Sequence, residues 1–181
     1  MNCPNCGNKG NKVKRITLES LLRDEAKSRI IDTQYYFCDS SECDTVYFSD
    51  AGSTFMKDDL TVRVGVKEKP GNAPRLVCYC FDHSIEEIEE EVKNTGGSTA
   101  LDDIKTRMKD GCFCETVSPK GGCCLGTVSA CIKDAVDQYG HGNDGKRAGH
   151  APGKPIEKEQ VDCCSGSHCC GSTDKTEVEP S

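Results

Sequence analysis

The sequence predicts an α+β protein: a small zinc-ribbon-like antiparallel β module, then a helical module, then a disordered tail rich in cysteine. Three observations support this order. β-branched and aromatic residues dominate the first 70 or so positions, helical periodicity replaces them between about 75 and 140, and apolar periodicity ends after Gly140. We place the boundaries at 1–72, 73–140 and 141–181, since the segment Lys69-Pro-Gly-Asn-Ala-Pro has the composition of a turn or linker.

The first module is expected to consist of strands. The pattern Leu-Thr-Val-Arg-Val-Gly-Val alternates as a half-buried strand does, and the other segments are rich in β-branched and aromatic residues. The expected strands are Val13 to Leu22, Ile30 to Cys38, Thr45 to Ser49 and Leu60 to Val66.

Helix signals mark the second module. Ser84-Ile-Glu-Glu is a capping box that opens a helix, and Gly96 ends it. A second helix is expected from Thr99 to Gly111, and a third after Cys124. Cys131 falls on the apolar stripe of the third helix, which favours a small core residue over a metal ligand.

Composition limits both the compartment and the partners. The 181 residues include 15 cysteines and no tryptophan, and only 35% are hydrophobic. Small modules of this kind usually need metal ions or disulfides to stabilise them. No secretory leader or membrane-spanning run is present, so we expect a soluble cytoplasmic protein whose thiols stay reduced and bind metal. The net charge of −7 argues against nucleic acid as a partner, and no membrane insertion is expected.

Two cysteine pairs predict a first metal site. Cys3 and Cys6 form a Cys-x2-Cys knuckle with a glycine behind it, and Cys38 and Cys43 provide a second pair. Four thiolates without histidine are typical of a closed, structural zinc site. Rubredoxin-like iron is the alternative that the same four ligands would accept.

A second group of thiols has a different pattern. The Cys78-x-Cys80 spacing is too tight for a zinc knuckle but suits two thiolates near one iron. Helices are expected to start shortly after Cys80 and directly after Cys124, and helix N-termini direct amides and positive potential towards anionic sulfur. A four-thiolate [2Fe-2S] cluster fits this arrangement.

The longer pattern resembles a known family. The Cys-x-Cys motif with its helices is similar to the bacterioferritin-associated ferredoxin (BFD) fold. Residues 1 to about 140 resemble the N-terminal domain of archaeal CopZ-type copper chaperones, on motifs that include Cys3-Pro-x-Cys6, Tyr36-Phe-Cys38, Cys43-x2-Val46-Tyr47-Phe48, Arg63-Val-Gly-Val-Lys67, Val77-Cys-Tyr-Cys80 and Pro119-x-Gly-x-Cys-Cys124.

The resemblance implies two cofactors and a copper-related role. It implies zinc on the first four cysteines, and a [2Fe-2S] cluster associated with reducing copper(II) for delivery as copper(I). By position, the cluster ligands would be Cys78, Cys80, Cys114 and Cys124. Cys112 and Cys123 stay open as rivals of Cys114 and Cys124. Implied partners are metal ions, a copper-transporting ATPase or a redox protein.

The chain departs from this family after residue 140. Such chaperones continue into a heavy-metal-associated domain with a Met-x-Cys-x2-Cys loop, and no such loop follows residue 140 here. Instead the segment is rich in glycine, proline and charge, which predicts disorder. It contains a group of thiols and one imidazole suited to a soft ion such as copper(I), mercury(II), arsenic(III) or zinc. These residues are Cys163, Cys164, His168, Cys169 and Cys170.

Three functions remain open at this point. The first is metal handling of the CopZ type, with at most a copper-reductase-like activity, since no conventional catalytic constellation is present. The second is a ferredoxin-like electron carrier. The third is an arsenic or mercury metallochaperone that uses the vicinal cysteines of the tail.

Overall fold

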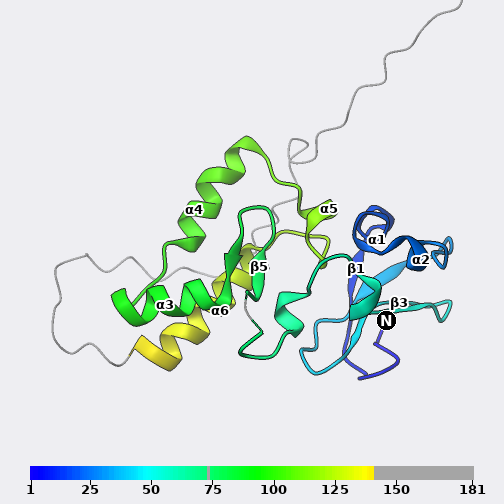
Figure 1. Ribbon diagram of the computed structural model, residues 1–181, viewed down its shortest axis with the longest axis horizontal. Helices are drawn as coiled ribbons and strands as arrows, with labels where there is room; N and C mark the ends of the chain where they lie inside the picture. The colour runs from blue at the N-terminus through cyan, green and yellow to red at the C-terminus, as the bar shows by residue number, and fades with distance from the viewer. Residues whose placement is uncertain (73, 141–181) are drawn as a thin grey trace, which may run out of the picture.

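The computed structural model (Figure 1) describes residues 1–72 and 74–140. The predictions for the segment 141–181, including its cysteines and His168, lie outside the described residues. The first half contains β1 (Asn11–Val13), α1 (Arg15–Leu21), α2 (Asp24–Lys27), β2 (Tyr35–Phe37), β3 (Thr45–Ser49), β4 (Thr54–Met56) and the 3-10 turns η1 (Lys57–Asp59) and η2 (Gly65–Lys67). The second contains β5 (Leu76–Cys78), β6 (His83–Ser84), α3 (Ile85–Thr95), α4 (Ala100–Arg107), η3 (Met108–Asp110), α5 (Cys114–Val117) and α6 (Leu125–Tyr139).

The first half is built on an antiparallel sheet of order β1-β2-β3-β4. Tyr36 pairs with Lys12 on one side and with Phe48 on the other, and Tyr47 pairs with Phe55. Aromatic side chains fill the core beneath the helices: Tyr35, Phe37, Tyr47 and Phe55 are each at most 1% exposed. The predicted antiparallel sheet followed by helices is confirmed.

Two strand predictions in this half are wrong. The segment predicted as a strand from Val13 to Leu22 is strand only at Val13, and α1 follows at Arg15. Thr17, Leu18 and Leu21 are three and four residues apart, so a helix places all three on its buried face. The strands at Ile30 to Cys38 and Thr45 to Ser49 are confirmed, although β2 is shorter than predicted.

The segment from Leu60 to Val66 is an irregular chain that ends in η2 rather than a strand. Its backbone groups find partners outside a sheet: the Thr61 amide donates to the Leu21 carbonyl, and the Gly65 amide donates to the Tyr79 hydroxyl. Alternation alone therefore predicted the wrong structure here, because hydrogen-bond partners decide whether an alternating segment joins a sheet.

The helix predictions in the second half are confirmed. The Ser84 hydroxyl accepts from the Glu87 amide at 3.2 Å, and the Glu87 carboxylate accepts from the Ser84 amide at 3.0 Å. Gly96 ends α3 in the left-handed region, with φ of 81°. The helices α3, α4 and α6 bury Val77, Ile88, Val92, Ile104 and Val128 in a second core.

The two halves contact one another, with α5 beside α1 in Figure 1. The Tyr47 hydroxyl donates to the Pro119 carbonyl at 2.8 Å, and the Tyr79 hydroxyl donates to the Arg63 carbonyl at 2.7 Å. Gly65 lies directly beneath β5, where an added Cβ would be 2.1 Å from the Leu76 carbonyl oxygen. The domain boundary at residue 72 stays a prediction. Among the described residues, no helix is both long and apolar enough to cross a membrane.

Candidate metal centres

The first candidate centre gathers four thiols from two loops. The sulfur atoms of Cys3, Cys6, Cys38 and Cys43 all lie within 4.8 Å of one another. The Sγ atoms of Cys3 and Cys43 are 3.9 Å apart, and those of Cys6 and Cys38 are 3.6 Å apart. A tetrahedron with zinc–sulfur bonds of about 2.3 Å has edges of about 3.8 Å, so these separations fit a single zinc ion.

Local structure positions these sulfurs. Gly7 adopts a φ of 76° and donates its amide to the Cys3 carbonyl at 2.9 Å, which turns the chain back after Cys6. The Cys38 amide donates to the Val46 carbonyl at 2.9 Å, where β2 leads into the second loop. Cys3, Cys38 and Cys43 are buried, whereas Cys6 is exposed.

The environment of the first centre favours thiolates at some positions and thiols at others. Burial raises the pKa of Cys38 to about 12. At Cys43 burial also acts to raise the pKa, but hydrogen bonds from the Thr45 amide and the Asn5 side chain outweigh it and lower the pKa to about 7. Metal binding at these four sulfurs must therefore release protons, as thiolate ligation requires.

The second candidate centre lies among the helices. Cys78 ends β5 and is fully buried, Cys114 begins α5 and is 8% exposed, and Cys124 is the N-cap of α6 and is 5% exposed. The Sγ atoms of Cys80 and Cys114 are 3.7 Å apart. The structure therefore brings together the four sulfurs that the resemblance names as cluster ligands, and α6 begins at one of them.

Thiol contacts link these residues further. Hydrogen bonding with Cys124 lowers the pKa of Cys114 to about 6 and that of Cys78 to about 7, and it raises the pKa of Cys124 itself. The backbone amides of Cys80 and Phe81 also bond to the Cys78 sulfur and lower its pKa. Amide donors aimed at sulfur stabilise anionic thiolates, which is what an iron–sulfur cluster needs from its ligands.

The rival thiols lie at the edge of this centre. Cys112 and Cys123 are partly exposed, in contrast to Cys114 and Cys124. Burial raises the pKa of Cys112 to about 11, and its thiol contacts that of Cys114. Cys131 is half-buried on α6 and packs against the second core, as predicted.

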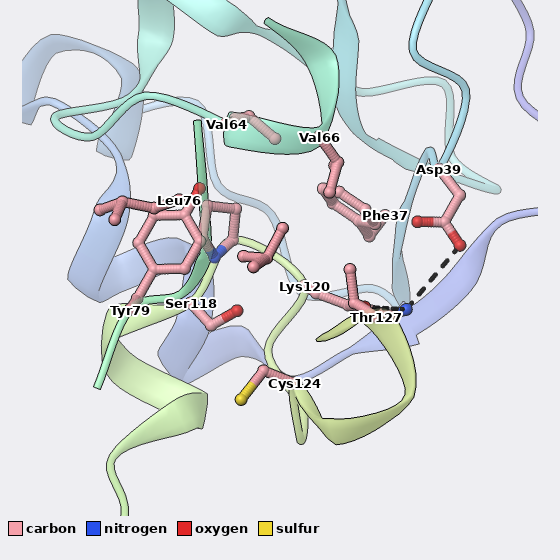
Figure 2. A pocket seen from close by; sticks show the side chains of 12 residues that line it. Phe37, Asp39, Val64, Val66, Leu76, Tyr79, Ser118, Lys120, Cys124 and Thr127 are labelled. Atoms are coloured by element: carbon pink, nitrogen blue, oxygen red, sulfur yellow. Dashed lines mark hydrogen bonds and ion pairs between the residues drawn. The ribbon is translucent and has the colours of Figure 1, made fainter. Parts of the chain in front are cut away.

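The second centre also borders the contact between the two halves. Cys124 lines a cavity of about 20 Å³ together with Phe37, Tyr79 and Ser118 (Figure 2). Lys120 lies over the same space, with its Nζ 3.2 Å from the Thr127 hydroxyl and 4.0 Å from Asp39. A cavity of this size accommodates about one water molecule.

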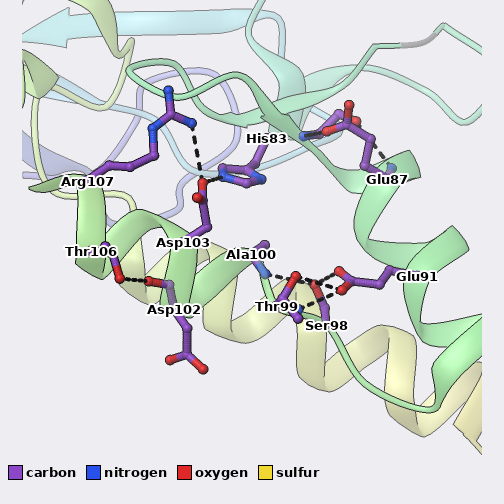
Figure 3. A network of polar contacts seen from close by, with 11 residues as sticks. His83, Glu87, Glu91, Ser98, Thr99, Ala100, Asp102, Asp103, Thr106 and Arg107 are labelled. Atoms are coloured by element: carbon purple, nitrogen blue, oxygen red, sulfur yellow. Dashed lines mark hydrogen bonds and ion pairs between the residues drawn. The ribbon is translucent and has the colours of Figure 1, made fainter.

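A polar network links β6, which follows the Cys-x-Cys turn, to α4 (Figure 3). The His83 Nε2 atom lies 2.9 Å from Asp103, which also accepts from Arg107 at 3.3 Å. The guanidinium of Arg107 lies 4.5 Å from the centre of the Phe81 ring. His83 is therefore engaged by a carboxylate of α4.

Several residues of these centres were not predicted from the sequence. In the polar network, the Glu91 carboxylate accepts from Ser98 and Thr99 and holds the start of α4 (Figure 3). Lys67 and Tyr79 lie within the motifs Arg63-Val-Gly-Val-Lys67 and Val77-Cys-Tyr-Cys80, which do not by themselves predict their contacts. Two signals in the sequence could have pointed to them: Tyr79 stands between two cysteines, and Lys67 follows an apolar run.

Comparisons with known proteins agree with the first centre. The family model zf_CopZ, described as a zinc binding domain, matches residues 1–61. The curated relative "Copper chaperone CopZ" of Archaeoglobus fulgidus is 32% identical over 124 residues, which are 68% of this chain. The matched part of this chain spans 58% of that protein.

A solved structure extends the similarity over both halves. The crystal structure of the Archaeoglobus fulgidus CopZ N-terminal domain is similar with a TM-score of 0.62 and 31% identity, over 72% of this chain and 96% of that one. Its fold is therefore shared beyond the zinc-binding segment. With nearly all of that domain matched, and with four cysteines gathered as a zinc site requires, this chain belongs to the CopZ N-terminal domain family.

Proposed function

We propose that this chain is a metal-handling protein of the CopZ type, with a structural zinc ion in the first centre and a redox-active [2Fe-2S] cluster in the second. One observation carries the proposal above all. Four thiols from three separate segments converge at the starts of α5 and α6, in a chain that also has a zinc-type site and is related to the CopZ N-terminal domain.

Zinc is assigned to Cys3, Cys6, Cys38 and Cys43. The support is their nearly tetrahedral spacing and the match of residues 1–61 to a zinc binding family. Four protein ligands leave no open position, so the ion stabilises the fold and does not bind substrate.

The cluster is assigned to Cys78, Cys80, Cys114 and Cys124. These sulfurs are mostly buried in an apolar core and receive amide hydrogen bonds, which suits an anionic cluster. Among residues 1–72 and 74–140, only the first centre has all its sulfurs within 4.8 Å of one another. A wider set of thiols fits a two-iron cluster better than a single ion.

Held by Cys78, Cys80, Cys114 and Cys124, a [2Fe-2S] cluster would supply one electron for the reduction of copper(II) to copper(I). A reduced redox protein would be the source of that electron. The role in copper comes from the relative's description as a copper chaperone, and a copper-transporting ATPase is the receiving partner we propose.

The tail supplies a second, softer ligand set in this proposal. Cys163, Cys164, His168, Cys169 and Cys170 offer thiolates and an imidazole, which prefer copper(I) among physiological ions. Because all these sites need reduced thiols, we propose that the protein works in the cytoplasm.

The proposal is tested on the full chain purified without oxygen. Iron, acid-labile sulfide, zinc and the visible spectrum are measured in the wild-type protein and in two matched variants, Cys124→Ser and Cys123→Ser. We expect two irons and one zinc per chain, loss of the cluster spectrum in Cys124→Ser, and its retention in Cys123→Ser. A colourless wild-type protein after reconstitution refutes the cluster, and the opposite pattern in the variants refutes the ligand choice.

Copper chemistry is tested on the reduced protein. Copper(II) is added after removal of excess reductant, and the cluster spectrum is followed. Oxidation of one cluster per copper supports the proposal, whereas an unchanged spectrum favours a ferredoxin-like carrier. Competition between copper(I) and arsenite for the full chain, compared with a tail variant in which all four cysteines are serine, tests whether the tail instead serves arsenic or mercury.

A further inference from the structure

Lys67 is a charged residue buried beside the first metal centre. Only 2% of its surface is exposed, although lysine is rarely buried. Its Nζ atom donates to the Ser40 carbonyl at 2.6 Å and to the Cys43 carbonyl at 3.0 Å. The ammonium also lies 5.8 Å from the centre of the Phe37 ring. It therefore holds the loop between Cys38 and Cys43 from inside the protein.

The usual partner of a buried ammonium is missing at this position. Among the salt bridges of residues 1–72 and 74–140, none joins Lys67 to a carboxylate. Carbonyl oxygens and an aromatic ring solvate a cation partly, but they carry no net charge. A buried charge without a counter-charge is unfavourable, so a negative group is expected nearby.

Glu42, Asp44 and Glu68 line the same pocket as Lys67, but none of them forms an ion pair with it. The remaining candidates for that negative group are the thiolates of the first centre, because the Lys67 ammonium donates to carbonyls of the loop that carries Cys43. Zinc with four thiolates carries a net charge of about −2, most of it on sulfur. The Lys67 ammonium is 3.0 Å from the backbone carbonyl of Cys43, one of the four ligands, and both residues are buried. A buried ammonium and the buried sulfurs of Cys38 and Cys43 would therefore offset each other's charge once zinc is bound.

We infer that the ammonium of Lys67 is the counter-charge of the zinc–thiolate centre and sets how tightly zinc is retained. The inference rests on the proposed zinc site and goes beyond it, because it assigns a role to a residue that does not touch the metal. Lys67 is a positioning residue in this sense: it acts through the Cys38–Cys43 loop and through its charge.

Three side chains at position 67 separate charge from packing and from hydrogen bonding. Lys67→Gln removes the charge but keeps a donor for the carbonyls, and Lys67→Met keeps the length but removes both. Lys57→Met is the matched control, because Lys57 is a neighbouring lysine whose Nζ is 3.2 Å from Asp44 and 3.0 Å from the Lys67 carbonyl. Its ammonium is therefore paired with a carboxylate rather than with the thiol loop.

The experiment measures zinc retention in the full chain against a competing chelator, under oxygen-free conditions. We expect Lys67→Gln and Lys67→Met to bind zinc at least tenfold more weakly, and Lys57→Met to stay within about twofold of the wild-type chain. Wild-type affinity in Lys67→Gln overturns the inference in favour of hydrogen bonding alone. Wild-type affinity in Lys67→Met overturns it in favour of packing.

A spectroscopic readout distinguishes charge from a general loss of structure. In the cobalt(II)-substituted first centre, a nearby cation stabilises the thiolate electrons, so its removal moves the thiolate-to-cobalt absorption band to longer wavelength. We expect this shift in Lys67→Gln but not in Lys57→Met. Weaker zinc binding without the shift overturns the inference.

A separate variant tests the zinc site itself. If Cys38→Ser retains zinc, the proposed zinc site fails, and this outcome is independent of any result at Lys67.

Discussion

The two candidate metal centres are built in different ways. The first takes its thiols from two loops at the end of a small sheet, and the sulfurs enclose a space the size of one ion. The second takes its thiols from a strand end, a turn and two helix starts, with an apolar helical core beneath. The difference teaches that two loops suffice to gather thiols around the space of one ion, whereas strand and helix ends hold the wider set of thiols in the second centre.

Removal of zinc gives the largest expected effect and tests how separate the two centres are. In Cys38→Ser we expect the first half to unfold, because zinc contributes on the order of 10 kcal/mol to the folding of small thiolate sites. We also expect the second half to lose its proposed cluster faster, since Tyr47 and Tyr79 form hydrogen bonds across the contact between the halves. Far-UV circular dichroism and the rate of visible bleaching measure the two effects. The control is Cys131→Ser, which removes a thiol outside both centres; unaltered cluster lifetime in Cys38→Ser would mean that the halves are independent.

A methyl group at Gly65 is expected to separate the two halves. In Gly65→Ala the new Cβ meets the Leu76 carbonyl at 2.1 Å, so β5 must move away from η2. We expect a loss of about 3 kcal/mol in unfolding free energy, as in overpacked interiors. Urea unfolding measures it, with Gly97→Ala as control because nothing lies within 4 Å of a Cβ there. Equal stability of the two variants contradicts the tight approach of β5.

The Tyr79 hydroxyl is expected to make a smaller contribution at the same contact. Tyr79→Phe removes one hydrogen bond to the Arg63 carbonyl and one from the Gly65 amide. Two hydrogen bonds correspond to about 2 kcal/mol. We expect the cluster to be lost more readily, because Tyr79 lies between Cys78 and Cys80, and zinc content to stay unchanged. If Tyr79→Phe instead loses zinc and keeps the cluster, the hydroxyl stabilises the first centre and not the second.

The smallest expected effect is confined to the second half. Ser84→Ala removes the N-cap of α3 and costs about 1 kcal/mol. Thermal unfolding of the cluster-loaded protein measures it, and zinc affinity serves as the internal control. A change in zinc affinity would contradict the assignment of Ser84 to the helical half alone.

The sequence predicted the helices and the cysteine pairs because their signals are local. Ser84 and Gly96 bound α3 through contacts within one or two turns, and the knuckle of Cys3 and Cys6 is only four residues long. The strand predictions failed at α1 and after Leu60, where β-branched residues serve a helix face and an irregular segment. The contact of Tyr47 with Pro119 joins positions 72 residues apart, and no local pattern encodes such a pairing.

The exposure of Cys6 has a consequence for the lifetime of the first centre. The other three cysteines of the site are buried, so oxidants and alkylating reagents reach the ligands of the metal ion only at the Cys6 sulfur. Damage and metal exchange should both begin with detachment of Cys6, which would leave the ion on a three-thiolate remnant inside the protein. The order in which the four sulfurs react with iodoacetamide reports this sequence of events directly.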